Sequence, residues 1–219
     1  GPTNLIGLLT EEERAKGVIC SSAGNHSQGV AIAAQQYGIQ AVVCMATNAT
    51  PSKIEATKGY GAEVVLHGSI WDEANEKALE LVKERGLTYI HPFDDPRLIA
   101  GQGTAGLEII EDWPEAEIIL VPIGGGGLIS GVSMAVKSVK AHVRVIGIES
   151  SGAPAMQKSI EAGHLITLDD VSSIIDGLRV KTVGVNTHSV VSRFVDEIVT
   201  LPDKKIFNAL IWLMARAKL

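Results

Sequence analysis

The residues with the clearest capacity for chemistry are four consecutive glycines and the leucine after them, Gly124, Gly125, Gly126, Gly127 and Leu128. Five of the six preceding residues are apolar and mostly β-branched, which predicts a strand buried on both faces of a parallel sheet. Residues 128–140 have helical spacing. A strand that passes through glycines into a helix directs free N–H groups at an anion, usually phosphate. A glycine-rich turn that binds nothing is the alternative.

The type of phosphate ligand can be narrowed from the residues around the glycines. A P-loop needs Lys followed by Ser or Thr, but Val132 and Ser133 follow Gly131, which argues against ATP. The dinucleotide pattern G-x-G-x-x-G would place its third glycine at Ile129 or Ser130. A dehydrogenase-type nucleotide site is therefore disfavoured, although Glu149 ends the next predicted strand about where a ribose-binding acid would lie.

A second run of small and polar residues opens a helix after the first predicted strand: Ser22, Ala23, Gly24, Asn25 and His26. The same physics predicts a second anion site, of a size for a carboxylate held by backbone amides and a hydroxyl. The alternative is that Ser22 or Asn25 only caps the helix. His26 by itself is more often a helix-start residue than a catalyst.

Strands and helices alternate along the chain and must position both loops. Strands are predicted at 18–22, 41–46, 63–67, 88–91, 118–123, 143–149 and 197–201. Helices are predicted at 25–37, from Pro51, and at 71–85, 97–112, 128–140, 153–162, 188–194 and 203–218. The fold class is α/β, with two doubly wound, mostly parallel open-sheet (αβα) layers. We expect residues 1–16 to be a connecting segment of the large domain, 17–95 a small α/β domain, and 96–219 a large, truncated α/β domain that holds the phosphate.

Two further expectations concern burial and the ends of the chain. A capping box of Thr10 and Glu13 predicts a short helix that ends at Gly17. The last helix has apolar residues on one face, which predicts a face suited to burial, and we expect residues 210–214 to be partly uncovered in this chain alone. The apolar residues of this face are Ile206, Leu210, Leu213 and Met214.

Composition excludes several classes of partner. A formal charge of −6 over 219 residues, without a basic run, argues against nucleic acid and anionic membrane surfaces. The apolar stretches are too short to cross a bilayer, and no signal peptide is expected. Cys20 and Cys44 lie in apolar strands and are predicted to be reduced core thiols, which favours the cytoplasm.

Taken together, the motifs resemble the fold-type II pyridoxal-phosphate enzymes, whose fold is similar to the tryptophan synthase β subunit. Within that group the chain is most similar to the threonine/serine dehydratases (threonine ammonia-lyases), with serine racemase nearby. The resemblance covers nearly the whole chain. It rests on SAGNH at 22–26, HPFDD at 91–95, IAGQGT at 99–104, GGGGL at 124–128 and IDG at 175–177.

The resemblance implies a cofactor, pyridoxal 5'-phosphate, and a role for each motif. The glycines and Leu128 would hold the cofactor phosphate, Asn25 the ring hydroxyl, and Gly177 would line the ring. The amides of residues 22–26 would hold the carboxylate of an amino-acid substrate. The implied reaction is α,β-elimination of L-threonine or L-serine to a 2-keto acid and ammonia, in a homo-oligomer, either a dimer or a tetramer.

The chain departs from the family at both ends. The Schiff-base lysine of the family would fall just upstream of Gly1, so no catalytic residue is predicted within this chain. The partner of the pyridine nitrogen would come from a strand after the last helix. We therefore expect a form that is incomplete at both termini and inactive alone. Lys16, Lys53 and Lys58 are predicted to be solvated helix residues rather than replacements.

Two positions separate elimination from racemisation. Racemases that resemble this sequence have a serine at Ala23, and alanine cannot supply a proton, so elimination is favoured. A racemase-like cation site would need an acidic residue where this chain has Ala155. Only Glu149 and the backbone of Ala153 remain as weak candidate ligands, so no metal is predicted. A serine racemase-like enzyme and a non-catalytic ligand-binding module of this fold are the alternatives.

Overall fold

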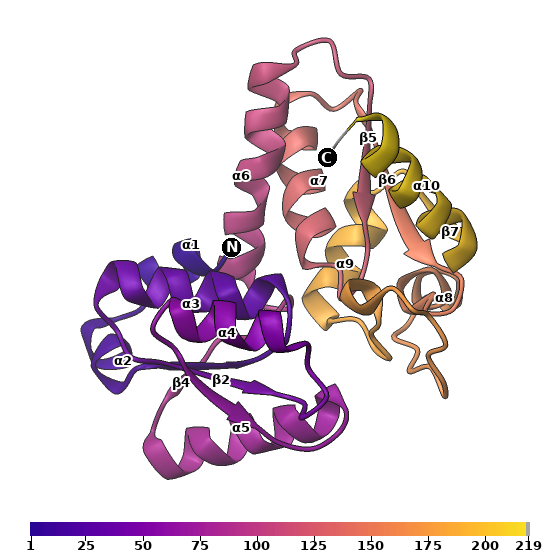
Figure 1. Ribbon diagram of the computed structural model, residues 1–219. Helices are drawn as coiled ribbons and strands as arrows, with labels where there is room; N and C mark the ends of the chain where they lie inside the picture. The colour runs from indigo at the N-terminus through magenta and orange to yellow at the C-terminus, as the bar shows by residue number, and fades with distance from the viewer. Residues whose placement is uncertain (218–219) are drawn as a thin grey trace. The chain divides into compact units, whose positions relative to one another are not determined.

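The computed structural model describes residues 1–217, and Lys218, which was predicted to lie in the last helix, is outside the described residues. The chain divides into two compact units, Gly1–Gly101 and Gln102–Leu219. Figure 1 shows the first unit in indigo to magenta and the second in magenta to yellow. Within residues 1–217, no helix is both long and apolar enough to cross a lipid bilayer.

A four-stranded parallel sheet forms the centre of the first unit. Its strands are β1 (Val18–Ser21), β2 (Ala41–Met45), β3 (Glu63–Leu66) and β4 (Thr88–Tyr89), in the order β3-β2-β1-β4. Its crossover helices are α3 (Asn25–Tyr37), α4 (Pro51–Gly59) and α5 (Trp71–Arg85). Every residue of β1 and β2 is buried, as predicted for strands covered on both faces.

Alternation along β1 divides the core of the first unit between the two faces of the sheet. Val18 and Cys20 join a cluster with Val30 and Ala34 of α3, whereas Ile19 joins a cluster with apolar residues of α5. Cys20 and the other cysteine, Cys44, are free and buried, as predicted.

Two short helices precede this sheet. Helix α1 (Pro2–Gly7) contributes Leu5 and Ile6 to the core, and α2 (Glu11–Lys16) follows it. The capping box is confirmed: Thr10 N donates to Glu13 Oε2 at 2.8 Å, and Glu13 N donates to Thr10 Oγ1 at 3.2 Å.

Helix α6 (Pro96–Asp112) runs from the first unit into the second and contains the glycines of the IAGQGT motif. Asp95 caps it by accepting a hydrogen bond from Arg97 N at 2.8 Å. Within the second unit, a Cβ on Gly103 would lie 3.0 Å from the backbone oxygen of Gly131, and one on Gly106 would lie 2.9 Å from that of Val132. The glycines of α6 therefore permit close contact with the helix that follows the phosphate loop.

The second unit contains a three-stranded parallel sheet. Its strands are β5 (Ile118–Pro122), β6 (Arg144–Ser150) and β7 (Glu197–Leu201), in that order. Its other elements are the helices α7 (Gly127–Val139), α8 (Ala155–Ala162), α9 (Val185–Phe194) and α10 (Asp203–Arg216), and the 3₁₀ turn η1 (Asp176–Leu178). Residues of β5, β6, α7, α8 and α9 share one apolar core.

In this unit the predicted burial of β5 on both faces is wrong, whereas the last helix is uncovered, as expected for this chain alone. In β5 only Ile119 and Val121 are buried, whereas Ile118 is 51% and Leu120 64% exposed, so one face of the strand is uncovered. Helix α10 has no buried residue, and Leu210 is 50% exposed. Apolar spacing reports which residues share a face, but among residues 1–217 no element covers that face in either case.

Candidate cofactor and substrate sites

The four glycines lie where predicted, between the end of β5 and the start of α7. Ile123 N donates to Ile148 O at 2.8 Å, which holds the end of β5 against β6. Gly126 has φ +92°, in the left-handed region that favours glycine. The first N–H groups of α7 have no carbonyl four residues before them to bind. The loop therefore presents unpaired amides at a helix N-terminus, the arrangement that binds anions.

Other parts of the second unit contact the glycine loop closely. A Cβ on Gly126 would lie 2.6 Å from Met156 Cε and 2.9 Å from Thr187 Cβ. A Cβ on Gly124 would lie 3.0 Å from Gly177 O, so the structure brings the predicted ring-lining glycine beside the predicted phosphate loop. Side chains at these two positions would displace backbone or packed atoms, so the loop needs glycine for more than its flexibility.

Thr187 anchors the loop, and sequence reasoning did not identify it. Its Oγ1 donates to Gly125 O at 2.8 Å and accepts from Gly184 N at 3.0 Å. The second hydrogen bond lies at the N-terminus of α9, which begins at Val185, three residues before the predicted start. The only local signal is a hydroxyl three residues after a glycine at a helix start.

Replacing Thr187 with valine is expected to weaken phosphate binding severalfold and to destabilise the second unit by about 1–2 kcal/mol. Valine keeps the shape but leaves Gly184 N without its acceptor. Phosphate titration and urea unfolding measure the two effects. Thr182→Val removes a hydroxyl that bonds only to Thr167 at the surface and serves as the control. Equal behaviour of the two variants would contradict the anchoring role.

The segment that carries Gly177 is held by Asp203 at the start of α10. Asp203 accepts hydrogen bonds from Ser150 Oγ at 2.5 Å, Ser173 Oγ at 2.9 Å and Ile174 N at 2.6 Å. The hydrogen bond from Ser150 is the largest cause that lowers the pKa of Asp203, which favours the charged acceptor. Asp203 thus ties the end of β6 to the residues before η1.

The second predicted loop follows β1 and opens α3. Ser22 N donates to Cys44 O at 3.2 Å and Gly24 N donates to Ser22 Oγ at 3.2 Å, so these two amides have partners within the protein. Asn25 and His26 are the first two residues of α3, and their N–H groups lack intrahelical partners. The side chain of Asn25 is exposed. Of the predicted carboxylate-binding amides, those of Ala23, Asn25 and His26 have no acceptor among the described residues.

Two side chains tie this loop to the rest of the sheet: that of His26, whose amide was predicted to bind the carboxylate, and that of Trp71, which the sequence did not assign to the site. His26 Nε2 lies 3.2 Å from Ile90 O, after β4. Trp71 Nε1, at the start of α5, donates to Ser21 O at 3.0 Å. Burial lowers the pKa of His26 to about 4, from an ordinary value of 6.5. His26 is therefore neutral at physiological pH.

The HPFDD motif forms a turn just after β4. His91 Nδ1 accepts hydrogen bonds from Phe93 N at 3.2 Å and Asp94 N at 2.8 Å, so the proton of the neutral ring is on Nε2. Burial also lowers the pKa of His91. Asp95, in the same motif, caps α6, so this motif has a structural role that its local geometry explains.

Glu149 is fully buried, and both of its carboxylate oxygens accept backbone N–H groups at the start of α8. The distances are 2.9 Å to Met156 N and 2.8 Å to Gln157 N. Burial raises the pKa of Glu149 to about 7 against the opposing effect of these amides. Ala153 and Ala155, the other positions of the weak cation candidate, are buried alanines. Glu149 therefore binds free N–H groups in the first turn of α8 from the end of β6, while Pro154 is the N-cap residue of that helix.

Three lysines could in principle replace the Schiff-base lysine of the family, and each is either paired at the surface or partly buried. Lys16 pairs with Glu12 at 2.7 Å and Lys58 with Glu55 at 3.1 Å, each within its own helix, and both lysines are exposed as predicted. Lys53 is half-buried, in contrast to the prediction that it is solvated.

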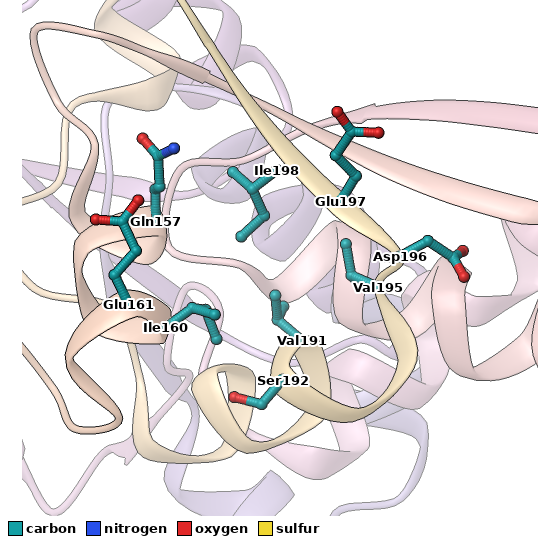
Figure 2. Close-up of a pocket in the computed structure, with 9 residues that line it drawn as sticks. All are labelled: Gln157, Ile160, Glu161, Val191, Ser192, Val195, Asp196, Glu197 and Ile198. Carbon is teal, nitrogen blue, oxygen red and sulfur yellow. The ribbon is translucent and has the colours of Figure 1, made fainter.

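A pocket of about 220 Å³ in the second unit lies away from the glycine loop. Figure 2 shows its apolar residues, among them Ile160 and Ile198, with carboxylates at the rim. It is formed where β7 begins, whereas the glycine loop follows the end of β5. Because the strands are parallel, the pocket lies at the amino ends of the strands and the glycine loop at their carboxyl ends. Two of the rim carboxylates are paired, Asp196 with Lys137 and Glu197 with Arg144.

Comparison with known proteins places this geometry in a family. The chain is 47% identical to the L-threonine ammonia-lyase of Thermotoga maritima over 218 residues, which are 100% of this chain and 54% of that protein. It is 43% identical to the catabolic L-threonine dehydratase TdcB of Staphylococcus aureus, of which it covers 63%. The chain thus spans between about half and two thirds of the length of the curated relatives it matches.

Solved structures agree with these relatives. The processed form of threonine deaminase isoform 2 from Solanum lycopersicum has a TM-score of 0.95 and 39% identity, over 100% of this chain and 64% of that one. Maize serine racemase has a TM-score of 0.95 and 37% identity, over 100% of this chain and 66% of that one. The profile of the family described as "Pyridoxal-phosphate dependent enzyme" matches residues 1–219. The chain belongs to the family of pyridoxal-phosphate dependent enzymes.

Proposed function

We propose that the intact protein containing this chain is a threonine/serine ammonia-lyase, which converts L-threonine or L-serine into a 2-keto acid and ammonia. The observation that carries the proposal is the glycine loop after β5, where a Cβ on Gly126 would collide with packed side chains. The chain that contains this loop is 47% identical to an L-threonine ammonia-lyase. Unpaired amides at the start of α7 fit the phosphate of pyridoxal 5'-phosphate.

The residues of this chain would bind and orient rather than transfer protons. The amides of Gly124, Gly125, Gly126, Gly127 and Leu128 would hold the cofactor phosphate. Asn25 would hydrogen-bond the ring hydroxyl, and Gly177 would line the ring. When bound, the cofactor supplies an electron sink that allows the Cα–H bond to break and the β-hydroxyl to leave.

The substrate carboxylate would be held at the start of α3. The predicted set is Ser22, Ala23, Gly24, Asn25 and His26. Because Ser22 N and Gly24 N already have partners within the protein, we assign the carboxylate to the remaining amides, those of Ala23, Asn25 and His26, of which the last two lie in the first turn of α3. The positive end of the dipole of α3 favours a carboxylate there.

Elimination is proposed over racemisation because of Ala23. Serine racemase is the second candidate, since maize serine racemase is 37% identical to this chain. Racemisation needs a proton donor on the second face of the cofactor ring, and the methyl group of Ala23 has no proton to donate.

An assay of the intact protein with pyridoxal phosphate tests this choice. Keto-acid release from L-threonine or L-serine is expected to exceed D-serine formation by at least about tenfold, since one proton donor is worth about 10²–10⁴ in rate. Ala23→Ser is expected to raise D-serine formation. Faster racemisation than elimination by the unaltered protein would refute the assignment, as would turnover that is independent of the cofactor.

We also propose the setting in which the intact protein works. The substrate is a small amino acid, and the protein is cytoplasmic, which its free, buried cysteines support. It would assemble as a homo-oligomer, a dimer or a tetramer. Its domains would be a connecting segment at 1–16, a small α/β domain at 17–95 and a phosphate-binding α/β domain at 96–219.

A further inference from the structure

We infer that His26 is a positioning residue for substrate binding, because its ring fixes the proposed carboxylate loop to the strand-end at Ile90. The inference rests on the proposed function, since it assumes that the amides at the start of α3 bind a carboxylate. It assigns to the His26 side chain a role separate from that of its backbone N–H.

The hydrogen bond of the ring defines this role. His26 Nε2 lies 3.2 Å from Ile90 O, and a carbonyl oxygen can only accept, so Nε2 carries the proton. Ile90 is fully buried, and its own N–H donates to Ile19 O at 2.8 Å. The acceptor is therefore hydrogen-bonded to the sheet, and the ring links the loop after β1 to the residue that follows the neighbouring strand β4.

A neutral ring suits positioning and does not suit direct binding of a carboxylate. Burial has the largest influence on its charge and opposes protonation, as does His91, whereas the hydrogen bond to Ile90 O favours protonation. The ring therefore carries no charge at neutral pH. Its only N–H is already donated to Ile90 and is not available to a substrate.

Local capping does not require His26. Ser22 Oγ accepts from Gly24 N at 3.2 Å, and Ser27 Oγ donates to Gly24 O at 2.6 Å, so the turn before α3 is held by its own hydroxyls. The ring instead bonds to a residue 64 positions away. Without it the turn would keep its shape, but the amides of Asn25 and His26 would lose their fixed direction relative to the sheet.

Titration of the full chain with L-serine, followed by amide NMR shifts, tests the inference. The variant His26→Gln places an N–H donor at a similar reach, and His26→Asn carries the same carboxamide one methylene shorter. We expect His26→Asn to weaken L-serine binding at residue 25 by about tenfold, and His26→Gln to remain within about threefold of the unaltered chain. Inorganic phosphate, measured at the amides of residues 126–128, should bind equally to all three proteins and reports an intact second unit. Urea unfolding followed at Trp71 reports whether the first unit, which contains residue 26, is folded in each variant.

The state of the ring provides a readout that needs no ligand. The ¹⁵N shifts of His26 should report a neutral ring protonated at Nε2 from pH 8 to pH 5. Equal L-serine binding by the Asn and Gln variants, or a ring that titrates near pH 6.5, would overturn the inference. If L-serine shifts no amide of residues 22–26 in the unaltered chain, the proposed substrate site is wrong and the inference falls with it. If L-serine binds there but the variants do not differ, only the role of His26 is wrong.

Discussion

Replacing Gly126 with alanine is expected to abolish phosphate binding at the loop after β5 and to destabilise the second unit by roughly 2–5 kcal/mol. Two costs add. The backbone at φ +92° is unfavourable for any residue with a Cβ. The added methyl would also lie 2.6 Å from Met156 Cε and 2.9 Å from Thr187 Cβ, so α8, α9 or the loop must move.

Gly163→Ala separates these two costs. Gly163 belongs to the same unit and has φ +71°, but a Cβ there meets nothing within 4 Å. This control should lose only about 1–2 kcal/mol of stability, and it should keep its affinity for phosphate. Phosphate titration by NMR and urea unfolding measure both quantities. A Gly126→Ala chain that is folded and binds phosphate as well as the unaltered chain would show that this loop is not the phosphate site.

The stabilities of the two units are expected to change in opposite directions between pH 8 and pH 5. In the first unit, the folded-state pKa of His26 is about 4 against an ordinary 6.5. A lowered histidine pKa means that the unfolded chain takes up the proton more readily, so stability is lost as the pH falls below 6.5. The loss at pH 5 is about 2 kcal/mol. The lowered pKa of His91 acts in the same direction.

In the second unit, a raised pKa makes stability fall as the pH rises. The pKa of Glu149 is about 7 in the folded state against an ordinary 4.5. A raised carboxyl pKa means that the folded state holds the proton more tightly, so stability is greatest at low pH and is lost as the pH rises through 7. The gain from pH 8 to pH 5 is about 2 kcal/mol. Lowered pKa values of Asp196 and Asp203 act only nearer pH 4, below this window.

Tryptophan fluorescence can follow each unit during urea unfolding, because Trp71 is in the first unit and Trp113 and Trp212 are in the second. Variants that keep the tryptophans of one unit and replace the others with phenylalanine report that unit alone. His26→Gln should flatten the pH dependence of the first unit, and Glu149→Gln that of the second. Slopes of the same sign in both units would contradict the prediction.

Local residue patterns were sufficient for most of the elements and for both loops. Helix α3 (Asn25–Tyr37), helix α5 (Trp71–Arg85) and strand β7 (Glu197–Leu201) have the predicted bounds. The capping box at Thr10 forms as predicted. Such features depend on residues a few positions apart, since hydrophobic period, helix capping and glycine backbone freedom act over one or two turns.

The sequence by itself therefore determined the parallel α/β architecture, the glycine loop at Gly126 and the polar loop at Asn25. Only the tertiary structure decided what holds the loops, because those partners are distant in sequence: Thr187 bonds to Gly125, and His26 to Ile90. It also decided burial on β5 and α10. An apolar stripe marks a face that favours removal from water, but whether another element covers that face depends on the packing of the whole unit.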